Sequence, residues 1–262
     1  METRVFYKYQ GAGNDFIIID NRKKLFDRDN ESLIRRLCHR RFGIGADGLM
    51  LLQHAEGYDF EMIYFNADGR EGSMCGNGGR CIVAFAQDIG IIATKTDFLA
   101  ADGVHHARMH DNVDWISLQM IDVQQIAQDG DAYLLDTGSP HYVRLVANLE
   151  NFPVVEEGRS VRYSDTYRSN GVNVNFVEAD GDGYRVRTYE RGVEDETLAC
   201  GTGATAVALA MAWRNGTDGA FETPIRVEGG NLMIRFEKQG RRFTNVFLEG
   251  PAEFVFKGEL SW

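Results

Sequence analysis

Two stretches of this chain carry the same uncommon pattern, and this repeat limits the possible folds more than any other feature. Residues 75–86 read CGNGGRCIVAFA and residues 200–210 read CGTGATAVALA. Each stretch places a Cys-Gly-x-Gly turn directly before an apolar, alanine-rich run that is typical of a buried helix. The offset between them is 125 residues, and a fixed period of this kind indicates repeated structural units.

The same shift of 125 residues also aligns other parts of the chain without gaps. It pairs Gly13 with Gly138, Phe16 with His141, Tyr64 with Tyr189 and Asn66 with Arg191. Chance matches in a chain with 29 glycines are the alternative. We interpret the pattern as a duplication, with an N-terminal half at residues 1–121 and a C-terminal half at 122–250, and we expect such halves to meet face to face.

The repeated turn places each cysteine, Cys75 and Cys200, at the N-terminus of a predicted helix. Unpaired backbone N–H groups and the helix dipole stabilise a thiolate there and also attract a carboxylate. Two such thiols facing one cleft indicate a specific chemistry, in which one removes a proton from a carbon and the other returns a proton to the opposite face. The result is inversion of a stereocentre. The alternative is that small cysteines merely pack against helix starts.

Other features receive structural interpretations. Cys38 has the spacing of an apolar helix face with Ile34 and Leu37, and Cys81 lies within the first predicted helix, so we expect both to be buried. Residues 43–48 match the GxGxxG dinucleotide fingerprint, but they follow a predicted helix and precede a strand. This order is the reverse of a nucleotide-binding turn.

Alternating and continuous apolar runs predict a strand-rich chain with one prominent helix in each half. Strands are expected at 5–9, 16–20, 48–53, 60–66, 115–119, 132–136, 142–145, 173–178, 184–189, 225–227, 231–236, 245–249 and 252–258. Helices are expected at about 30–40, 78–89 and 203–215, with a short helical turn at 145–148.

Composition excludes several classes of protein. The formal net charge of −11 disfavours binding to nucleic acids and anionic membranes. Apolar runs are too short to span a bilayer, and the first residues lack a signal peptide's apolar stretch, so we expect a cytoplasmic protein. Four cysteines in such a protein indicate reduced thiols, and since none form a CxxC pair we expect no structural zinc.

With these residues identified, the sequence resembles the diaminopimelate epimerases, which interconvert LL- and meso-diaminopimelate without a cofactor for lysine and peptidoglycan synthesis. The resemblance covers essentially the whole chain. It is carried by GAGNDF at 11–16, RFGIGAD at 41–47, FNADG at 65–69, MCGNGGR at 74–80, GSPH at 138–141, VNV at 172–174 and YERGVEDETLACGTG at 189–203. Proline racemases and hydroxyproline epimerases share the two-cysteine design but lack the last of these blocks, and they are the alternative within enzymes.

The resemblance implies a role for each matching residue. Cys75 and Cys200 would be the acid/base thiols, and the backbone N–H groups of Gly76, Asn77, Gly201 and Thr202 would bind the carboxylate at the reacting carbon. Asn14, Asn66, Asn173, Glu190 and Arg191 would surround the rest of the substrate, with Arg191 pairing with the distal carboxylate. His141 and Glu190 would tune the thiol pKa values through their charges. No cofactor and no metal are implied.

Two positions depart from the commoner family pattern. Ser139 stands where many members have Asn, and Gly48 stands where some members have a substrate-contacting Gln. A serine hydroxyl still bonds a ligand, whereas glycine offers only its backbone, so the strictness of substrate choice is in question.

The family fold is α/β, with two pseudo-symmetric domains that each form a β-barrel-like sheet around a central helix. The resemblance further implies that the C-terminal strand, at about 251–262, returns to the first domain, and that the protein is a homodimer. A binding or scaffold protein that has lost the chemistry is the alternative outside enzymes, but retention of both thiols argues against it.

Overall fold

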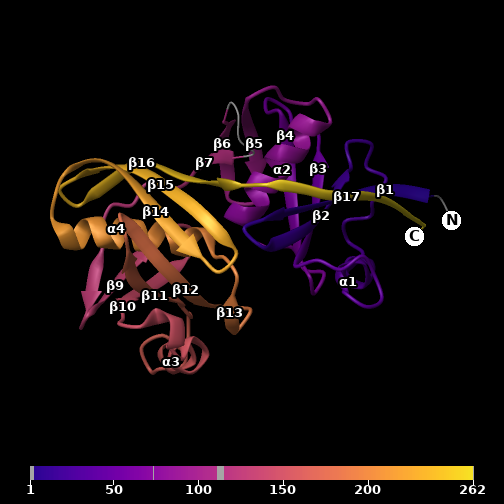
Figure 1. Cartoon of the computed structure of the whole chain (residues 1–262). Coiled ribbons are helices and arrows are strands. Elements are labelled where there is room, and N and C mark those ends of the chain that lie inside the picture. The colour runs from indigo at the N-terminus through magenta and orange to yellow at the C-terminus, as the bar shows by residue number, and fades with distance from the viewer. Residues whose placement is uncertain (1–2, 73, 111–114, 262) are drawn as a thin grey trace. The chain divides into compact units, whose positions relative to one another are not determined.

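A computed structural model describes residues 3–72, 74–110 and 115–261 of the chain (Figure 1). Its contacts divide the chain into two compact units, one of Met1–Leu118 with Gly250–Trp262 and one of Gln119–Glu249. The internal boundary falls after residue 118, and the sequence repeat had placed it after residue 121. Among the described residues, no helix has the length and apolar composition needed to cross a membrane.

The first unit is a mixed sheet with two helices. Neighbouring strands pair in chain order, with β2–β3 and β4–β5 parallel and the other pairs antiparallel. The last strand of the chain, β17, pairs antiparallel with β1, the first. The elements are β1 Thr3–Gly11, β2 Asn14–Asp20, α1 Glu31–Cys38, β3 Gly48–Gln53, β4 Phe60–Asn66, α2 Gly76–Asp88, β5 Lys95–Ala100, β6 Gly103–Met109, β7 Trp115–Gln119 and β17 Glu253–Ser261.

The second unit repeats this succession of strands and helices. Its parallel pairs are β10–β11 and β12–β14, which correspond to the two parallel pairs of the first unit. The elements are β8 Ala127–Asp129, β9 Ala132–Asp136, β10 Pro140–Leu145, η1 Leu149–Asn151, α3 Val154–Arg162, β11 Asn173–Asp180, β12 Gly183–Glu190, β13 Asp195–Thr197, α4 Gly201–Asn215, β14 Gly219–Val227, β15 Gly230–Gln239 and β16 Arg242–Pro251.

The correspondence extends to the register of individual residues. Phe16 lies opposite Gly48 in the β2–β3 pair, and His141 lies opposite Asn173 in the β10–β11 pair. Both members of the second pair are displaced by 125 residues from those of the first, the offset of the cysteine turns. The two units are therefore built on one plan.

Each unit encloses one helix. In α2, every residue from Gly76 to Ala86 is buried, and the helix packs against β1, β2, β3, β4, β6 and β17. In α4, almost every residue from Gly201 to Ala212 is buried, and the helix packs against β9, β10, β11, β12, β14 and β15. A helix that is apolar on all sides requires such surroundings, so the alanine- and glycine-rich sequence and the strands around it agree. The predicted α/β class is confirmed.

The structure also contains elements that the sequence analysis missed. In strand β6 the side chains of His106 and Arg108 are exposed, whereas that of His105 is only 11% exposed, so a polar residue takes an inward position and weakens the apolar alternation. The helical turn predicted at 145–148 is wrong, since Leu145 ends β10 and the helix of this region is α3. Helix α3 carries Gly158 at its centre, and a Cβ atom there would lie 2.4 Å from Cβ of Tyr189. The close packing of α3 on β12 therefore requires glycine at position 158, and glycine has a low helix propensity, so the sequence pattern of this helix is weak.

Candidate active site

Cys75 and Cys200 are the N-cap residues of the two enclosed helices. Both have extended backbone conformations, with φ and ψ of −109° and 123° at Cys75 and −119° and 107° at Cys200. The first helical bonds run from Gly79 N to Cys75 O at 2.7 Å and from Ala204 N to Cys200 O at 2.9 Å. The N–H groups between these residues have no acceptor inside their helix, and they point toward the thiol end. Each helix start therefore favours a negative charge.

Glycines keep both helix starts closely packed. A Cβ atom at Gly203 would lie 2.4 Å from Oδ1 of Asn175 and 3.3 Å from Sγ of Cys200. In the first unit, a Cβ atom at Gly79 would lie 2.7 Å from Cε of Met74. At Gly203 a side chain would therefore collide with Asn175 beside the thiol, and in the first unit Gly78 and Gly79 lie in close packing against Met50 and Met74.

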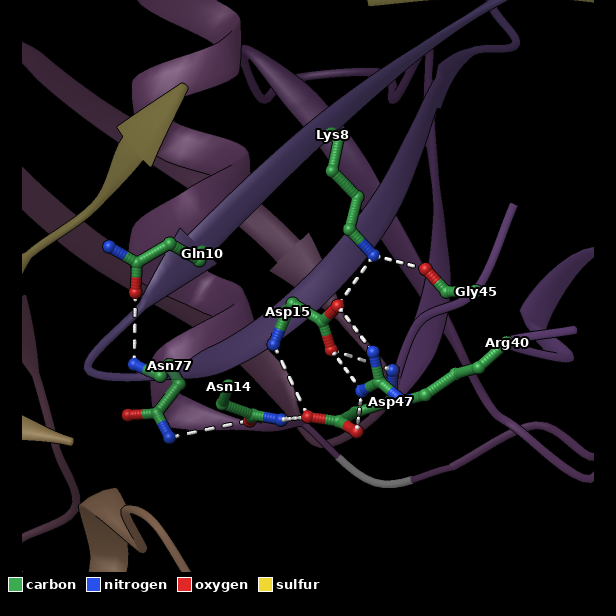
Figure 2. A network of polar contacts seen from close by, with 9 residues as sticks. Lys8, Gln10, Asn14, Asp15, Arg40, Gly45, Asp47 and Asn77 are labelled. Carbon is green, nitrogen blue, oxygen red and sulfur yellow. Dashed lines mark hydrogen bonds and ion pairs between the residues drawn. The ribbon is translucent and has the colours of Figure 1, made fainter. Parts of the chain in front are cut away.

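A tight hairpin brings Asn14 to the Cys75 thiol. Ala12 and Gly13 have φ values of 52° and 83°, and Gly11 pairs with Asn14 across them, which is the geometry of a two-residue type I′ turn. The Asn14 side chain lies at the start of β2, where its Oδ1 accepts from Sγ of Cys75 at 3.7 Å. Oδ1 also accepts from Nδ2 of Asn77 at 3.3 Å (Figure 2). Three predicted site residues of this unit are therefore in direct contact.

Asn66 and Gly48 lie opposite one another at the ends of β4 and β3. A Cβ atom at Gly48 would lie 2.4 Å from a ring carbon of Tyr64 and 2.9 Å from its hydroxyl oxygen. A Cβ atom at Gly72 would lie 2.9 Å from the other side of the same ring and from Nδ2 of Asn66. The Tyr64 ring thus fills the space between two glycines, and no side chain fits at position 48 unless Tyr64 moves.

Asn173, Ser139 and Arg191 form a cluster in the second unit. Oδ1 of Asn173 accepts from the Arg191 backbone N–H at 2.8 Å, and its Nδ2 donates to Oγ of Ser139 at 2.9 Å. The Arg191 guanidinium donates to the Asn170 carbonyl at 3.0 Å and is exposed. Glu190, the last residue of β12, accepts from Oγ1 of Thr197 at 2.9 Å. The structure brings these predicted residues to one end of the β11–β12 pair.

His141 is fully enclosed beside this cluster, and its protonation state follows from its neighbours. Nδ2 of Asn175 lies 3.1 Å from Nδ1 and can only donate, so Nδ1 accepts. The ring proton is therefore on Nε2, which donates to Oγ of Ser139 at 3.1 Å. Burial and the nearby Arg191 guanidinium lower the pKa of His141 to about 3. The expectation that His141 acts through its charge is therefore corrected, because at neutral pH the ring is uncharged and acts only through hydrogen bonds.

The remaining groups near Cys200 come from the first turn of α4 and from the loop before β10. Sγ of Cys200 lies 3.4 Å from Oγ1 of Thr202. Oγ1 of Thr137 donates to the Thr202 carbonyl at 2.8 Å, which attaches the loop before β10 to the start of α4. This loop carries Ser139, so its hydroxyl and the thiol belong to the same region of the unit.

The other two cysteines are core residues, as predicted. Cys38 is 2% exposed and Cys81 is fully buried. Burial raises the pKa of Cys38 to about 12 and also raises the pKa of Cys81 well above its usual range. Both thiols therefore stay protonated at neutral pH. In the described residues, no three His, Cys, Asp or Glu side chains gather in a way that would hold a metal ion.

Sequence reasoning missed several polar residues around the thiols. Asp47 and Arg80 belong to motifs that carried the resemblance, but neither received a role. Asn175, which is buried and orients His141, lies two residues after Asn173 on β11 and could have been found from the alternation of the strand.

Comparison with known proteins identifies the family. A family model described as diaminopimelate epimerase matches residues 6–125 and 133–255. The chain belongs to the diaminopimelate epimerase family. A protein named diaminopimelate epimerase from Flavobacterium psychrophilum is 54% identical over 252 residues, covering 96% of this chain and 98% of that protein. The protein of the same name from Chlorobaculum tepidum is 44% identical over 259 residues, covering 96% and 99%.

Solved structures of lower identity show that the fold extends beyond this family. A Bacillus anthracis phenazine biosynthesis protein of the PhzF family superposes with a TM-score of 0.78 at 15% identity, over 100% of both chains. A hydroxyproline epimerase from Agrobacterium vitis superposes with a TM-score of 0.72 at 17% identity, over 98% of this chain and 92% of that one. At these identities the likeness concerns the fold alone.

The neutral, buried His141 predicts a specific pH dependence of stability. Between its pKa of about 3 in the folded state and the ordinary 6.5 in the unfolded state, the unfolded chain binds more protons. The free energy of unfolding should therefore fall as the pH drops below 6.5, by about 2 kcal/mol at pH 5. Urea unfolding of the wild type and of His141→Gln measures this, and the variant should lose the dependence. The exposed His54→Gln is the control, and an equal slope in all three proteins would refute the assignment.

Proposed function

We propose that this protein interconverts LL- and meso-diaminopimelate, in the route to lysine and peptidoglycan, with Cys75 and Cys200 as the two acid/base groups. The observation that carries the proposal is the repeated position of the two thiols. Each is the N-cap of the one enclosed helix of its unit, at the same place in a duplicated plan. Both have polar neighbours, whereas Cys38 and Cys81 are core residues. Reduced thiols suit the reducing cytoplasm, where we place the protein.

In this mechanism one thiolate removes the proton from the α-carbon of the substrate and becomes a thiol. The other thiol gives its proton to the opposite face of the same carbon and becomes a thiolate, so the number of protons is unchanged. The carboxylate on that carbon accepts from the N–H groups of Gly76, Asn77, Gly201 and Thr202. These donors stabilise the charge that develops on the carboxylate when the α-proton leaves.

The second amino acid end of the substrate needs its own polar partners. We assign the distal carboxylate to Arg191, whose exposed guanidinium can form a bidentate pair. Asn66 and Glu190 are assigned to the distal ammonium group, and Asn14 and Asn173 to the remaining polar contacts. We also assign Glu190 a role beside the thiols through its negative charge, whereas His141 acts through its hydrogen bond to Ser139.

The two departures from the family pattern have structural explanations that bear on substrate choice. Tyr64 occupies the space in which a side chain at position 48 would lie, so we assign its hydroxyl to this corner of the binding site. Ser139 accepts hydrogen bonds from His141 and Asn173, which leaves its own O–H to donate. We assign that donor to an oxygen of the bound substrate.

We also propose that the protein is a homodimer that associates through β17. This strand exposes apolar side chains that a monomer would leave in water. Phe254 is 52% exposed, and Val255 and Phe256 beside it are also exposed. Such a patch marks an interaction surface. Sedimentation velocity should show a dimer that Val255→Glu converts to a monomer, and a wild-type monomer at micromolar concentration would contradict the proposal.

The thiol assignment predicts the behaviour of four cysteine variants. Cys75→Ser and Cys200→Ser should each reduce epimerisation by at least about 100-fold, because a hydroxyl is too weak an acid to replace a thiol at neutral pH. Proton NMR of diaminopimelate in D₂O with reduced protein measures both exchange of the α-proton and the LL-to-meso ratio. Cys38→Ala and Cys81→Ala are the matched controls and should keep their activity. Near-normal turnover by Cys75→Ser would end the two-thiol mechanism.

The assignment of Arg191 predicts the substrate preference. Arg191→Met should raise the activation free energy for diaminopimelate by about 2–4 kcal/mol, because the distal carboxylate loses its charged partner. Lysine, which lacks that carboxylate, should be a very poor substrate of the wild type. The ratio of kcat/KM for the two amino acids measures the effect.

Arg185→Met is the control for this experiment, since Arg185 lies on β12, the strand that Arg191 follows, but pairs with Glu150 and Glu228. It should keep the wild-type ratio. Comparable rates on lysine and diaminopimelate in the wild type would refute the assignment of Arg191 to the distal carboxylate. Such an outcome would favour a pocket of the proline-racemase kind.

A further inference from the structure

A chain of hydrogen bonds connects two opposite charges past the Cys75 thiol in the first unit. Nη2 of Arg80 donates to Oδ1 of Asn77 at 3.0 Å, and Nδ2 of Asn77 donates to Oδ1 of Asn14 at 3.3 Å. Nδ2 of Asn14 then donates to Oδ2 of Asp47 at 2.7 Å. Figure 2 shows the two amides and Asp47 in succession. The chain therefore begins at a cation and ends at an anion.

The charges at the two ends determine how both amides are turned. An asparagine side chain by itself can present either its oxygen or its nitrogen to a neighbour. A guanidinium only donates and a carboxylate only accepts, so Asn77 must turn its oxygen to Arg80 and Asn14 must turn its nitrogen to Asp47. As a consequence Oδ1 of Asn14 faces the Cys75 thiol, from which it accepts at 3.7 Å.

Both ends of the chain are anchored by contacts of their own. Arg80 is fully buried and also donates to the carbonyl oxygens of Gly76 at 3.2 Å and Pro251 at 3.4 Å. Asp47 accepts from Nη2 of Arg40 at 2.7 Å. Arg40 makes two further bonds to Asp15, at 2.6 and 3.0 Å, and Asp15 also pairs with the buried Lys8 at 2.6 Å.

We propose that Asp47 and Arg80 are positioning residues that turn the Asn14 amide so that its oxygen accepts from the Cys75 thiol. An acceptor at this place stabilises the S–H form and opposes the thiolate, whereas an inverted amide would donate to the thiolate. The observed orientation of Asn14 therefore favours the S–H form of Cys75 relative to an inverted amide.

Other charged or titratable groups lie on the elements around this thiol. They remain unchanged in the test, apart from the residue that each variant replaces. They are Arg80 and the protonated Cys81 on α2, Lys8 on β1, Asp15 on β2, Arg40 and Asp47 in the segment before β3, and Glu253 on β17. A direct effect of the Asp47 charge on the thiol must therefore be separated from an effect that passes through Asn14.

The experiment measures the rate at which iodoacetamide alkylates Cys75 as a function of pH, with the modified peptide identified by mass spectrometry. In Asp47→Asn the carboxylate that holds Nδ2 of Asn14 is lost, and only the donor from Asn77 still keeps Oδ1 of Asn14 in place. The inverted amide then becomes more populated, and the midpoint of the pH profile should fall by up to about one pH unit. Asp47→Glu, which keeps the carboxylate, should stay near the wild type. Cys38 and Cys81 report folding in the same sample, since both are buried and should stay unmodified. If Asp47→Asn exposes them, Asp47→Ser takes its place.

A double-mutant cycle separates orientation from charge. Asp47→Asn is repeated in an Asn14→Ala background, where no amide remains to turn. Under the proposal the shift in midpoint disappears there. An unchanged midpoint in Asp47→Asn overturns the proposal, and so does a shift that persists in full without Asn14, because the Asp47 charge would then act on the thiol directly.

The inference rests on the proposed function only in treating Cys75 as an acid/base group. Alkylation involves no turnover and no diaminopimelate, so the two ideas fail separately. A protein without epimerase activity would still report the orientation of Asn14. An active epimerase whose Cys75 profile ignores Asp47 would refute the positioning role alone.

Discussion

Enclosing a helix among strands is the constraint on which this structure depends. Helices α2 and α4 are buried on all sides, so nearly every position must be small or apolar. The first N–H groups of such a helix cannot all reach bulk water, and a buried donor without a partner costs free energy. Polar groups must therefore gather at the helix start. At the start of α2 the chain places Cys75 and the Asn14 hairpin, and at the start of α4 it places Cys200 and the loop that carries Thr137 and Ser139.

The parts of the fold that could be predicted are those with a local signal. The cysteine turns, the alanine-rich helices and strands such as 48–53 and 60–66 agree with the structure because their patterns depend on neighbouring residues. Strand β6 and helix α3 were missed for the opposite reason. In β6 Val104 is exposed and His105 faces inward, which reverses the apolar alternation there. Gly158 in α3 is needed for contact with Tyr189 on a strand 31 residues later in the chain. Tertiary packing decides both cases.

The site shows the same division. Its members could be named from motifs, but their hydrogen-bond directions could not, because these depend on residues far apart in the chain. Asn14 is oriented by Asp47 and Asn77, and His141 is kept neutral by burial and by Arg191. Arg80 is part of a recognisable motif, yet a guanidinium in a sequence gives no sign that it is fully buried and bonded to neutral oxygens. The roles of His141 and Arg80 could be assigned only once both the charge and the burial of each side chain were known.

The two units differ at corresponding registers, and one of these differences has a consequence for symmetry. Gly48 and Asn173 occupy corresponding places opposite Phe16 and His141. The first presents bare backbone covered by the Tyr64 ring, and the second an amide that bonds to Ser139 and Arg191. Two identical halves would treat the ends of a twofold-symmetric molecule alike. Divergence at corresponding strand positions gives the two units different polar groups at the same place in a shared plan.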